Sequence, residues 1–433
     1  MATLSSPLLR VRLRSVLMFL SIVGPGIITA NADNDVGGIG TYSLAGAQFG
    51  YSLLWLLIPV TVILYVAQEM CARMGVITGK GLADLIRENF GVKVTFWVLV
   101  LFVLGDLGNV ATEFAGVFSS GTIFHTYVAL ISPYMLVPLV ALLVFVTVTS
   151  NSRKIVERIF FVFCAVYVAY IISGIIVHPN WHDVLIGTFL PHFTPSKAYF
   201  LMIVGVIGTT IAPWQQFYIQ AAAAEKGVPQ ADYKYTQWDV AIGSISCDIV
   251  AFFIILASAA TIYVFNAGHP AHPITVSLPS DVAVALTPLA GKFASLLFAI
   301  GLLNAAMFTA SILPLSTAYY VCEAFGFERG IELHFKQAPI FYSLYLAFIV
   351  IGAGVVLLPG APLLGIIFYS QVVNGALLPI VLVLTLLLVN NKRLMGAYTN
   401  SLTFNVIAWA TVIIVGALTV VSVVTSLVPS LSS

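Results

Sequence analysis

Long apolar runs alternate with short polar loops along almost the whole chain. A helix needs roughly 20 apolar residues to cross the hydrocarbon core of a bilayer. On this criterion the pattern predicts eleven membrane-spanning helices, at residues 16–47, 50–76, 94–121, 128–149, 155–178, 199–224, 238–267, 292–325, 338–358, 363–390 and 402–427. Residues 81–90 (GLADLIRENF) form a short amphipathic segment, which we expect at the membrane interface.

The first apolar run is interrupted near its middle by the polar sequence NADNDVGG at residues 31–38. Ionisable residues inside a bilayer are rare, and they usually face a bundle interior or a water-filled cavity. Helical backbone at membrane depth is broken mainly where it lines a cavity or a ligand, and a glycine pair favours such a break. The pattern therefore indicates a transport site at a broken first helix.

Composition excludes a soluble protein and gives no sign of an enzyme. Of the 433 residues, 60% are hydrophobic and 8% are charged, which is far outside the range of soluble domains. The formal net charge of +1 gives no indication of a nucleic-acid partner, and no obligate protein partner is evident. The four cysteines lack CxxC spacing and fit buried apolar positions. The seven histidines fall in loops or at span ends, so no catalytic metal site and no cofactor are expected.

Lysine and arginine residues set the expected orientation, because cytoplasmic loops carry their excess. With a cytoplasmic N-terminus, the eleven spans place 16 of the 18 basic residues on the cytoplasmic side and leave Lys197 and Lys292 outside. A missed or additional span early in the chain would destroy this bias. The sequence thus predicts a multi-pass plasma-membrane protein with an extracellular C-terminus. The basic N-terminus lacks a small-residue cleavage site after its apolar run, so we expect a retained helix.

Two parts of the chain repeat a pattern. The run FLSIVG at 19–24 resembles FLMIVG at 200–205, and span 6 is interrupted at 212–216 (APWQQ) much as span 1 is interrupted. With five spans in each unit, the second copy would enter the membrane from the opposite side, which is typical of secondary transporters. We expect a single transporter domain over residues 1–433, with repeats at about 16–178 and 199–390 and an additional helix at 402–427.

Five segments resemble helices of one transporter family. GPGIITANADNDVGGIGTYSLAGAQFG (24–50) is similar to a first helix with the motif DPGN, and TTIAPWQQF (209–217) to a sixth helix with the motif MPH. Residues 302–325, 370–379 and 390–396 are similar to the eighth helix, the tenth helix and the following loop. The family is the NRAMP divalent-metal transporters. The resemblance implies an all-α polytopic LeuT-type fold, with a cation held between the unwound parts of helices 1 and 6.

The resemblance also implies a set of metal ligands. Asp35 stands where the family has its metal-binding aspartate, and Gly38 stands at the family's asparagine. The backbone carbonyls of Ala32 and Thr209 would be ligands. Ala212 replaces the family's methionine, which removes a thioether from the expected site.

Further positions are expected to line the site or to affect coupling. Trp214 replaces the family's histidine, and Gln371 matches a helix 10 glutamine that approaches the metal. Glu113 matches a helix 3 glutamate, but the proton-carrying aspartate one turn earlier is Val110, so proton coupling is expected to be weak or absent. The candidate lining residues are Asp33, Trp214, Gln215, Asn374 and Glu113.

The replaced ligands change the metal that the site should prefer. A thioether favours softer transition metals, whereas carboxylate, carbonyl and water suit Mg²⁺, Ca²⁺ and Mn²⁺. Replacement by glycine and alanine also opens space, and Mg²⁺ tends to keep several waters when bound. This combination resembles the magnesium-transporting branch related to the family. We therefore expect an importer of Mg²⁺, with Mn²⁺ as a second substrate, that works by alternating access without obligatory proton coupling.

Several residues have a structural interpretation beside the functional one. Asp35 could cap the broken helix instead of binding metal, and Asp33 could hydrogen-bond to freed backbone instead of lining a vestibule. Asp106, Asn109 and Glu113 share one helix face and favour a buried polar network over an aqueous lining. Asp248 in span 7 has no evident partner in the sequence and is assigned no role.

Two other kinds of transporter fit parts of the pattern. A proton-coupled Mn²⁺ or Fe²⁺ importer of the ordinary NRAMP kind is the nearest alternative, and Ala212, Trp214 and Val110 argue against it. A sodium-coupled amino-acid symporter would share the broken helices, but Asp35 at the break would repel a substrate carboxylate. Oxygen ligands alone do not separate Mg²⁺ from Mn²⁺.

Overall fold

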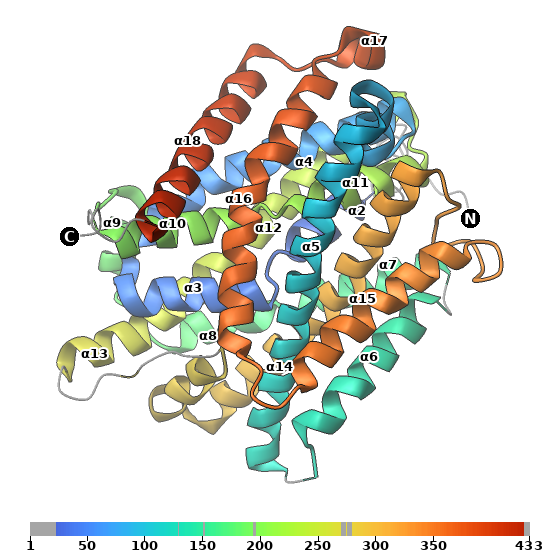
Figure 1. The fold of residues 1–433 in the computed structure, drawn as a ribbon. Helices are drawn as coiled ribbons and strands as arrows, with labels where there is room; N and C mark the ends of the chain where they lie inside the picture. The colour runs from blue at the N-terminus through green and yellow to red at the C-terminus, as the bar shows by residue number, and fades with distance from the viewer. Residues whose placement is uncertain are drawn as a thin grey trace, which may run out of the picture.

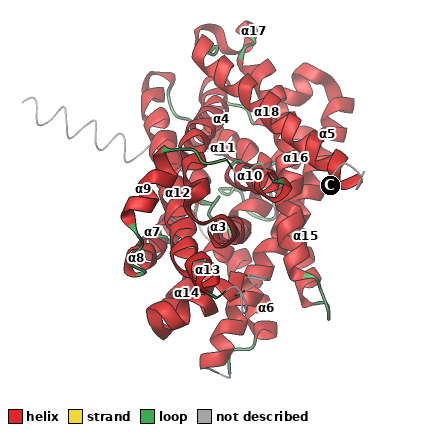
Figure 2. Ribbon diagram, turned by 90° about the vertical axis from the view of Figure 1, so that its left-hand side faces the viewer, coloured by secondary structure: helices red, strands yellow, loops and turns green. Residues whose placement is uncertain are grey.

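Helices make up all the regular secondary structure of the part of the chain that the structure describes (Figure 1, Figure 2). In this computed structural model the described residues are 23–128, 130–149, 152–193, 196–269, 274 and 279–427. The start of the first predicted span (16–22), with most of the FLSIVG run, lies outside them. The all-α architecture predicted from the apolar pattern is confirmed.

The helix bounds follow the predicted spans closely. The first half of the chain contains α2 (Pro25–Asn31), α3 (Val36–Phe49), the short η1 (Gly50–Leu56), α4 (Leu57–Thr78), α5 (Leu82–Tyr127), α6 (Pro133–Thr149), α7 (Arg153–Val166), α8 (Val168–Ile176) and α9 (Trp181–Phe189). The second half contains α10 (Lys197–Thr210), α11 (Pro213–Lys226), η2 (Gln230–Asp232), α12 (Tyr233–Ser258), η3 (Ala259–Tyr263), α13 (Val264–Gly268), α14 (Pro279–Phe325), α15 (Pro339–Leu357), α16 (Leu363–Val389), α17 (Lys392–Met395), η4 (Gly396–Tyr398) and α18 (Leu402–Leu427).

Nine stretches within the described residues are long and apolar enough to cross a membrane. One of them, Val36–Thr78, runs through two of the predicted spans, and the predicted fourth span is the shorter apolar helix Pro133–Thr149. These observations account for all eleven predicted spans. The segment expected at the interface is the first part of α5, which is separated from the rest by a kink at Gly91, where φ is 82°.

Both predicted interruptions are present. Helix α2 ends at Asn31 and α3 begins at Val36, while α10 ends at Thr210 and α11 begins at Pro213. Proline at the first position of a helix loses no intrahelical hydrogen bond, because that N–H would have no partner in any case. Ala212 before it has an extended backbone, with φ −72° and ψ 142°. The two breaks therefore expose unpaired backbone groups in the interior of the bundle.

The half-helix α2 packs backbone to backbone against α12. A Cβ atom built on Gly243 would lie 2.5 Å from the carbonyl oxygen of Gly26, and one built on Gly26 would lie 2.6 Å from the amide nitrogen of Val240. Small residues that let two backbones approach are typical of helix contacts in membranes. The position of α2 is consequently set by contact with α12.

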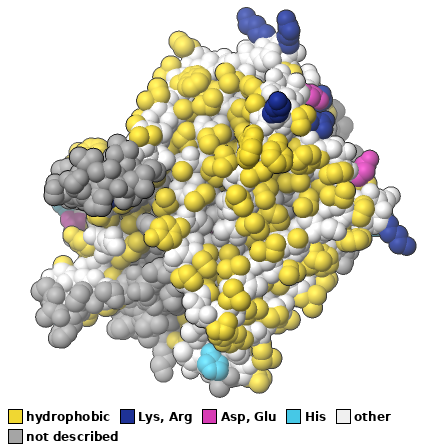
Figure 3. Space-filling model, in the orientation of Figure 1, with side chains coloured by type: hydrophobic (Ala, Val, Ile, Leu, Met, Phe, Trp, Pro, Cys, Tyr) yellow, Lys and Arg dark blue, Asp and Glu magenta, His cyan; other side chains and the backbone are white. Residues whose placement is uncertain are grey.

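The loops expected to be cytoplasmic contact one another at one end of the molecule. Arg73 at the end of α4 donates to the carbonyl of Tyr398 at 3.0 Å, Arg153 donates to the carbonyl of Ala222 at 3.2 Å, and Arg329 pairs with Asp84. On the face drawn in Figure 3, the basic side chains lie toward the upper and right-hand edges, and hydrophobic side chains are spread widely over the described surface between and below them. This arrangement fits a membrane-embedded body with one basic end.

The α2–α12 contact should tolerate no side chain at Gly243. We expect Gly243→Leu to separate the two backbones and to lower the unfolding free energy by about 1–3 kcal/mol, as overpacking does elsewhere. Thermal unfolding of the purified protein, followed by intrinsic fluorescence, measures the change. Gly354→Leu on α15 is the matched control, because a Cβ at Gly354 has no atom within 4 Å. Equal melting temperatures for the two variants would contradict the close approach.

Candidate metal site

Asp35 lies at the start of α3 and caps it. Its carboxylate accepts a hydrogen bond from the backbone N–H of Gly38 at 2.5 Å, and its side chain is 4% exposed. A carboxylate at a helix N-terminus is stabilised by the unpaired amides and by the helix dipole. Asp35 therefore does cap the broken helix, and this does not prevent it from binding a metal ion as well. Because an ionised carboxylate has about four acceptor positions, capping leaves capacity for a cation.

The carbonyl of Ala32, which the family resemblance makes a ligand, lies at the end of α2 and already has one partner. It accepts a hydrogen bond from the hydroxyl of Thr309 on α14 at 2.9 Å. A carbonyl oxygen has two lone pairs, so one remains for a cation. Thr309 thus holds the unwound segment at a fixed position, and no sequence pattern indicated this contact.

Gly38 does not leave the open space that the sequence analysis expected. A Cβ atom at this position would collide with the backbone carbonyl of Asp33 and would lie 3.3 Å from an oxygen of Asp35. The backbone of the unwound segment fills the volume that a side chain at position 38 would occupy. The expectation of added room at Gly38 is therefore wrong, and a backbone oxygen stands close to the Asp35 carboxylate instead.

The break in the sixth span begins where α10 contacts α3 and α16: the Thr210 hydroxyl lies 2.7 Å from that of Tyr42, and a Cβ atom on Gly208 would lie 3.0 Å from the Gln371 carbonyl oxygen. Thr209 lies in the last turn of α10, where carbonyl groups have no intrahelical partner, and Ala212 begins α11. The Trp214 carbonyl accepts from Ser316 at 2.9 Å, and the Gln215 side-chain oxygen accepts from Gln68 at 3.1 Å. Trp214 and Gln215 are thus engaged with α14 and α4, respectively.

Helix α16 closes the site over Gly37. A Cβ atom at Gly37 would collide with the side-chain amide of Gln371, so the two groups are in direct contact. The Gln371 oxygen accepts from Asn374 at 3.2 Å, and Asn374 exchanges hydrogen bonds of 2.8 and 3.0 Å with Asn109 on α5. Gln371 therefore lies beside the break as expected. Asn374 mainly joins α16 to α5.

The polar residues on one face of α5 make two kinds of contact. Asp106 accepts hydrogen bonds from Thr317 at 2.7 Å and Tyr320 at 2.8 Å, as a structural network would require. Glu113 instead reaches the break, where one oxygen accepts from the Val36 N–H at 3.4 Å and the other is buried without a partner. The network interpretation holds for Asp106 and Asn109, and Glu113 lies beside Asp35.

All the predicted ligands and lining residues are buried, so solvent has little access to them. Asp35 at 4% is the most exposed of the residues for which a fraction is given. Within the described parts of the chain, no three Asp, Glu, His or Cys side chains converge as a metal-binding group. A cation at this position would therefore depend on one carboxylate together with carbonyl and amide oxygens.

A carboxylate that sequence reasoning missed caps the start of α2. Asp239 on α12 accepts hydrogen bonds from the backbone N–H groups of Gly24 at 3.1 Å, Gly26 at 2.7 Å and Ile27 at 3.2 Å. These are the unpaired amides at the start of α2. Asp239 lies at the edge of a predicted span, where an acidic residue is unremarkable, so its role could not be seen without α2 beside it.

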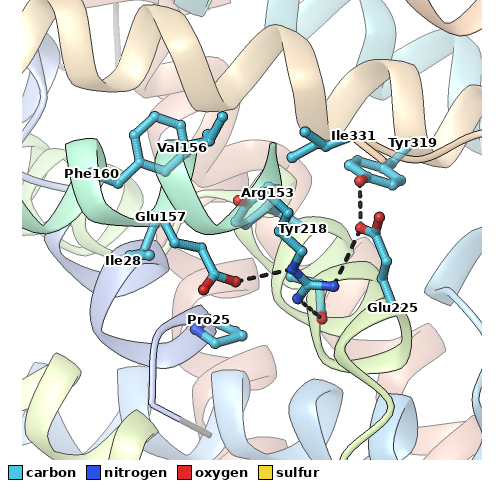
Figure 4. A pocket seen from close by; sticks show the side chains of 11 residues that line it. Pro25, Ile28, Arg153, Val156, Glu157, Phe160, Tyr218, Glu225, Tyr319 and Ile331 are labelled. Carbon is cyan, nitrogen blue, oxygen red and sulfur yellow. Dashed lines mark hydrogen bonds and ion pairs between the residues drawn. The ribbon is translucent and has the colours of Figure 1, made fainter. Parts of the chain in front are cut away.

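An ionic network surrounds a small cavity beneath α2 (Figure 4). The Arg153 guanidinium lies 3.0 Å from Glu157 and 3.9 Å from Glu225, and Glu225 also accepts from the Tyr319 hydroxyl. Lys226 donates to the carbonyl of Val23 at 2.9 Å. Figure 4 shows Pro25 and Ile28 at the edge of this cavity, so the network and Asp239 both lie against the first half-helix and help to hold it in place.

Comparison with known proteins identifies the family. The family model described as natural resistance-associated macrophage protein-like matches residues 26–425. The chain belongs to the Nramp family. The resemblance noted in the sequence is thereby confirmed, and so is the coarse functional prediction of a divalent metal transporter of the Nramp type embedded in a membrane.

Individual Nramp relatives and related folds agree with this assignment. The divalent metal cation transporter MntH of Klebsiella pneumoniae is 27% identical over 403 residues, which cover 92% of both chains. A manganese transporter from Eremococcus coleocola has a TM-score of 0.74 at 22% identity and covers 93% of this chain and 86% of its own. Mhp1, a nucleobase-cation-symport-1 family transporter, has a TM-score of 0.57 at 14% identity and covers 93% and 92%. The predicted LeuT-type fold is confirmed.

Membership of the Nramp family gives no support to the alternative of a sodium-coupled amino-acid symporter. The identities of the metal ligands stay predictions. The structure brings Asp35, Gly38, Gln371 and Glu113 together around the start of α3. It engages Gln215 and Asn374 mainly in contacts between helices.

Removing the Asp239 carboxylate should loosen α2. Asp239→Ala leaves three N–H groups without acceptors, two of them in buried hydrogen bonds, and each buried unsatisfied group costs about 1–3 kcal/mol. The reporter is Ile28→Cys in protein whose four native cysteines are replaced. We expect a hydrophilic maleimide, added on the side of the basic loops, to label it at least about tenfold faster than with Asp239 intact, since about 1.4 kcal/mol is a factor of ten. Glu88→Gln, which removes only the exposed ion pair with Lys80, is the control. Unchanged labelling in Asp239→Ala would refute the anchoring role.

Proposed function

We propose that this Nramp transporter imports Mg²⁺ through the site at the two helix breaks, with Mn²⁺ as a second substrate. The observation that carries the proposal is Ala212 at the start of α11, where the family motif has methionine. Without that thioether, the donors beside the break are the Asp35 carboxylate, backbone carbonyls and the Gln371 amide. Such oxygen donors suit Mg²⁺ and Mn²⁺.

A partly hydrated ion fits this donor set. Mg²⁺ gives up its waters reluctantly and is usually bound through one or two carboxylates with several waters retained. The Asp35 carboxylate, with Glu113 nearby, supplies that number. Since Gly38 leaves no added room, the space for retained waters depends on the small side chain of Ala212. The further preference for Mg²⁺ over Mn²⁺ rests on the resemblance to the magnesium-transporting branch.

Transport is proposed to proceed without obligatory proton coupling. Val110 is fully buried and packs against Gly352 of α15, where a Cβ atom would lie 2.6 Å from the valine side chain. An apolar, tightly packed residue cannot relay a proton, and Trp214 provides no titratable group at the other break. A divalent cation gains about 4.6 kcal/mol from an inside-negative potential of 100 mV, at about 2.3 kcal/mol per charge. That free energy is sufficient to drive uptake.

The proposal includes a plasma-membrane location with a cytoplasmic N-terminus and an extracellular C-terminus. The basic loops that contact one another at one end support this orientation, because cytoplasmic loops carry the excess of basic residues. We further propose that the protein catalyses no chemical reaction and needs no cofactor, the metal ion being its substrate.

Mg²⁺ influx into proteoliposomes tests the proposal directly. With a magnesium dye and a pH dye inside, we expect Mg²⁺ to enter without matching acidification, because no proton path accompanies the site. Asp35→Ala should reduce influx at least about 100-fold, a change of about 2.7 kcal/mol, within the cost of losing a charged partner. Entry of Mn²⁺ with protons while Mg²⁺ is excluded would instead establish the proton-coupled importer.

Restoring the thioether should change metal preference. Ala212→Met places a soft donor beside the break, and we expect the ratio of Cd²⁺ to Mg²⁺ uptake to rise about tenfold, equivalent to about 1.4 kcal/mol. Competition between the two ions in the same proteoliposomes measures the ratio. Ala212→Leu, similar in bulk but without sulfur, should slow Mg²⁺ entry and leave the preference unchanged. If both variants shift the ratio equally, size and not ligand chemistry decides selectivity.

A further inference from the structure

Asp33 is buried without a hydrogen-bond donor. It lies in the unwound segment two residues before Asp35, is 1% exposed, and neither carboxylate oxygen has a partner. The expectation that Asp33 could bond to backbone freed by the break is therefore wrong. A buried carboxylate that lacks donors is strongly unfavourable unless a cation or a proton balances its charge. Asp33 thus requires a partner that the protein does not supply.

A second carboxylate in the same condition lies on α12, one residue after Cys247, whose carbonyl Asn34 of the unwound segment contacts. Asp248 is 5% exposed, and both its oxygens lack a partner. Thr61 comes close to Asp248, but its hydroxyl donates to the Leu57 carbonyl at 2.7 Å. None of the ion pairs among the described residues includes Asp33 or Asp248. Both carboxylates are therefore buried without a countercharge from the described residues.

The side-chain oxygen of Asn34 gives a separate indication of a ligand. Asn34 is fully buried, and its side-chain nitrogen donates to the carbonyl of Cys247 at 3.2 Å, which places Asn34 against α12 beside Asp248. The Asn34 side-chain oxygen has no partner. Its nitrogen is held by a carbonyl, which leaves the oxygen as an acceptor. Two carboxylates and an amide oxygen form the kind of donor set that hard divalent cations prefer.

The two sets of donors lie on either side of the same unwound segment. Asp35 with Glu113 and Gln371 is on the side of α5 and α16, whereas Asp33 and Asn34 are on the side of α12. The carbonyl of Asp33 reaches back to Gly38, so the segment itself connects them. Since no three Asp, Glu, His or Cys side chains in the described residues converge as a metal-binding group, an ion on the α12 side would keep waters between itself and the carboxylates.

We propose that Asp33, Asn34 and Asp248 form a second binding position for a hydrated divalent cation, next to the Asp35 position and separated from it by the unwound backbone. The inference rests on the proposed function, because it assumes that a divalent ion passes through the break. The ion is exchanged between the two positions during transport. Asp248, to which the sequence assigned no role, becomes a ligand through water.

Counting bound Mn²⁺ in the purified full-length protein tests this position independently of transport. The electron paramagnetic resonance signal of free Mn²⁺ reports how much has bound. We expect the Asp35→Asn variant to retain a weaker site, with at least about a tenfold higher Kd, and the Asp35→Asn/Asp248→Asn variant to retain none. Loss of all binding in Asp35→Asn alone, in protein that still melts cooperatively, would overturn the proposal.

A matched variant separates ligand binding from folding. Asp106→Asn also neutralises a buried carboxylate, but one that Thr317 and Tyr320 already satisfy, and combined with Asp35→Asn it should leave the residual site intact. Mg²⁺ should raise the melting temperature of Asp35→Asn, by mass action, and should not raise that of Asp35→Asn/Asp248→Asn. Equal Mg²⁺ responses in these two variants would also overturn the proposal. Absence of Mg²⁺ influx in the wild type, with Mn²⁺ binding as expected, would refute the proposed function and leave the second position standing.

Discussion

The interruption of the first helix between Asn31 and Val36 is the constraint on which the other features of this protein depend. Breaking a helix in a bilayer leaves amide and carbonyl groups that no lipid can satisfy. Here side chains from other helices satisfy them. Thr309 donates to the Ala32 carbonyl, while Asp35 and Glu113 accept from the first amides of α3. The same carboxylates that make the break tolerable place negative charge where a cation can be held.

Capping and the proposed metal binding would consequently be two uses of one arrangement. A carboxylate that only satisfied amides would not need a second acid beside it, and Glu113 has one oxygen without a donor. The excess of acceptors over donors around the segment is greatest at Asp33 and Asp248, where four carboxylate oxygens lack partners. Such an excess is unfavourable by itself and would become favourable with a bound cation. Under the proposed function, selectivity for charge would follow from incomplete hydrogen bonding.

Local sequence was sufficient to locate the break but not to describe its surroundings. Asp35 could be found because a charge inside an apolar run is rare, and Pro213 because proline ends a helix. The space at Gly38 was misjudged. A missing side chain leaves space only if no other group fills it, and here the Asp33 carbonyl occupies that volume. Asp239 and Thr309 act on backbone atoms of α2 from helices more than 200 residues away in the chain. Ordinary positions within their own helices give no signal of such contacts.

The backbone contact between Gly26 and Gly243 has a consequence for the speed of the transport cycle. Where interlocking side chains join two helices, separation requires many rotamers to change together. Two glycine surfaces have no rotamers to rearrange, so α2 would leave α12 as a rigid unit once its hydrogen bonds to Asp239 and the one from Asn31 to Ser246 break. The barrier to such a movement would then lie mainly in these polar contacts. Opening rates in this protein should accordingly respond more to nearby charge than to temperature-dependent loosening of the core.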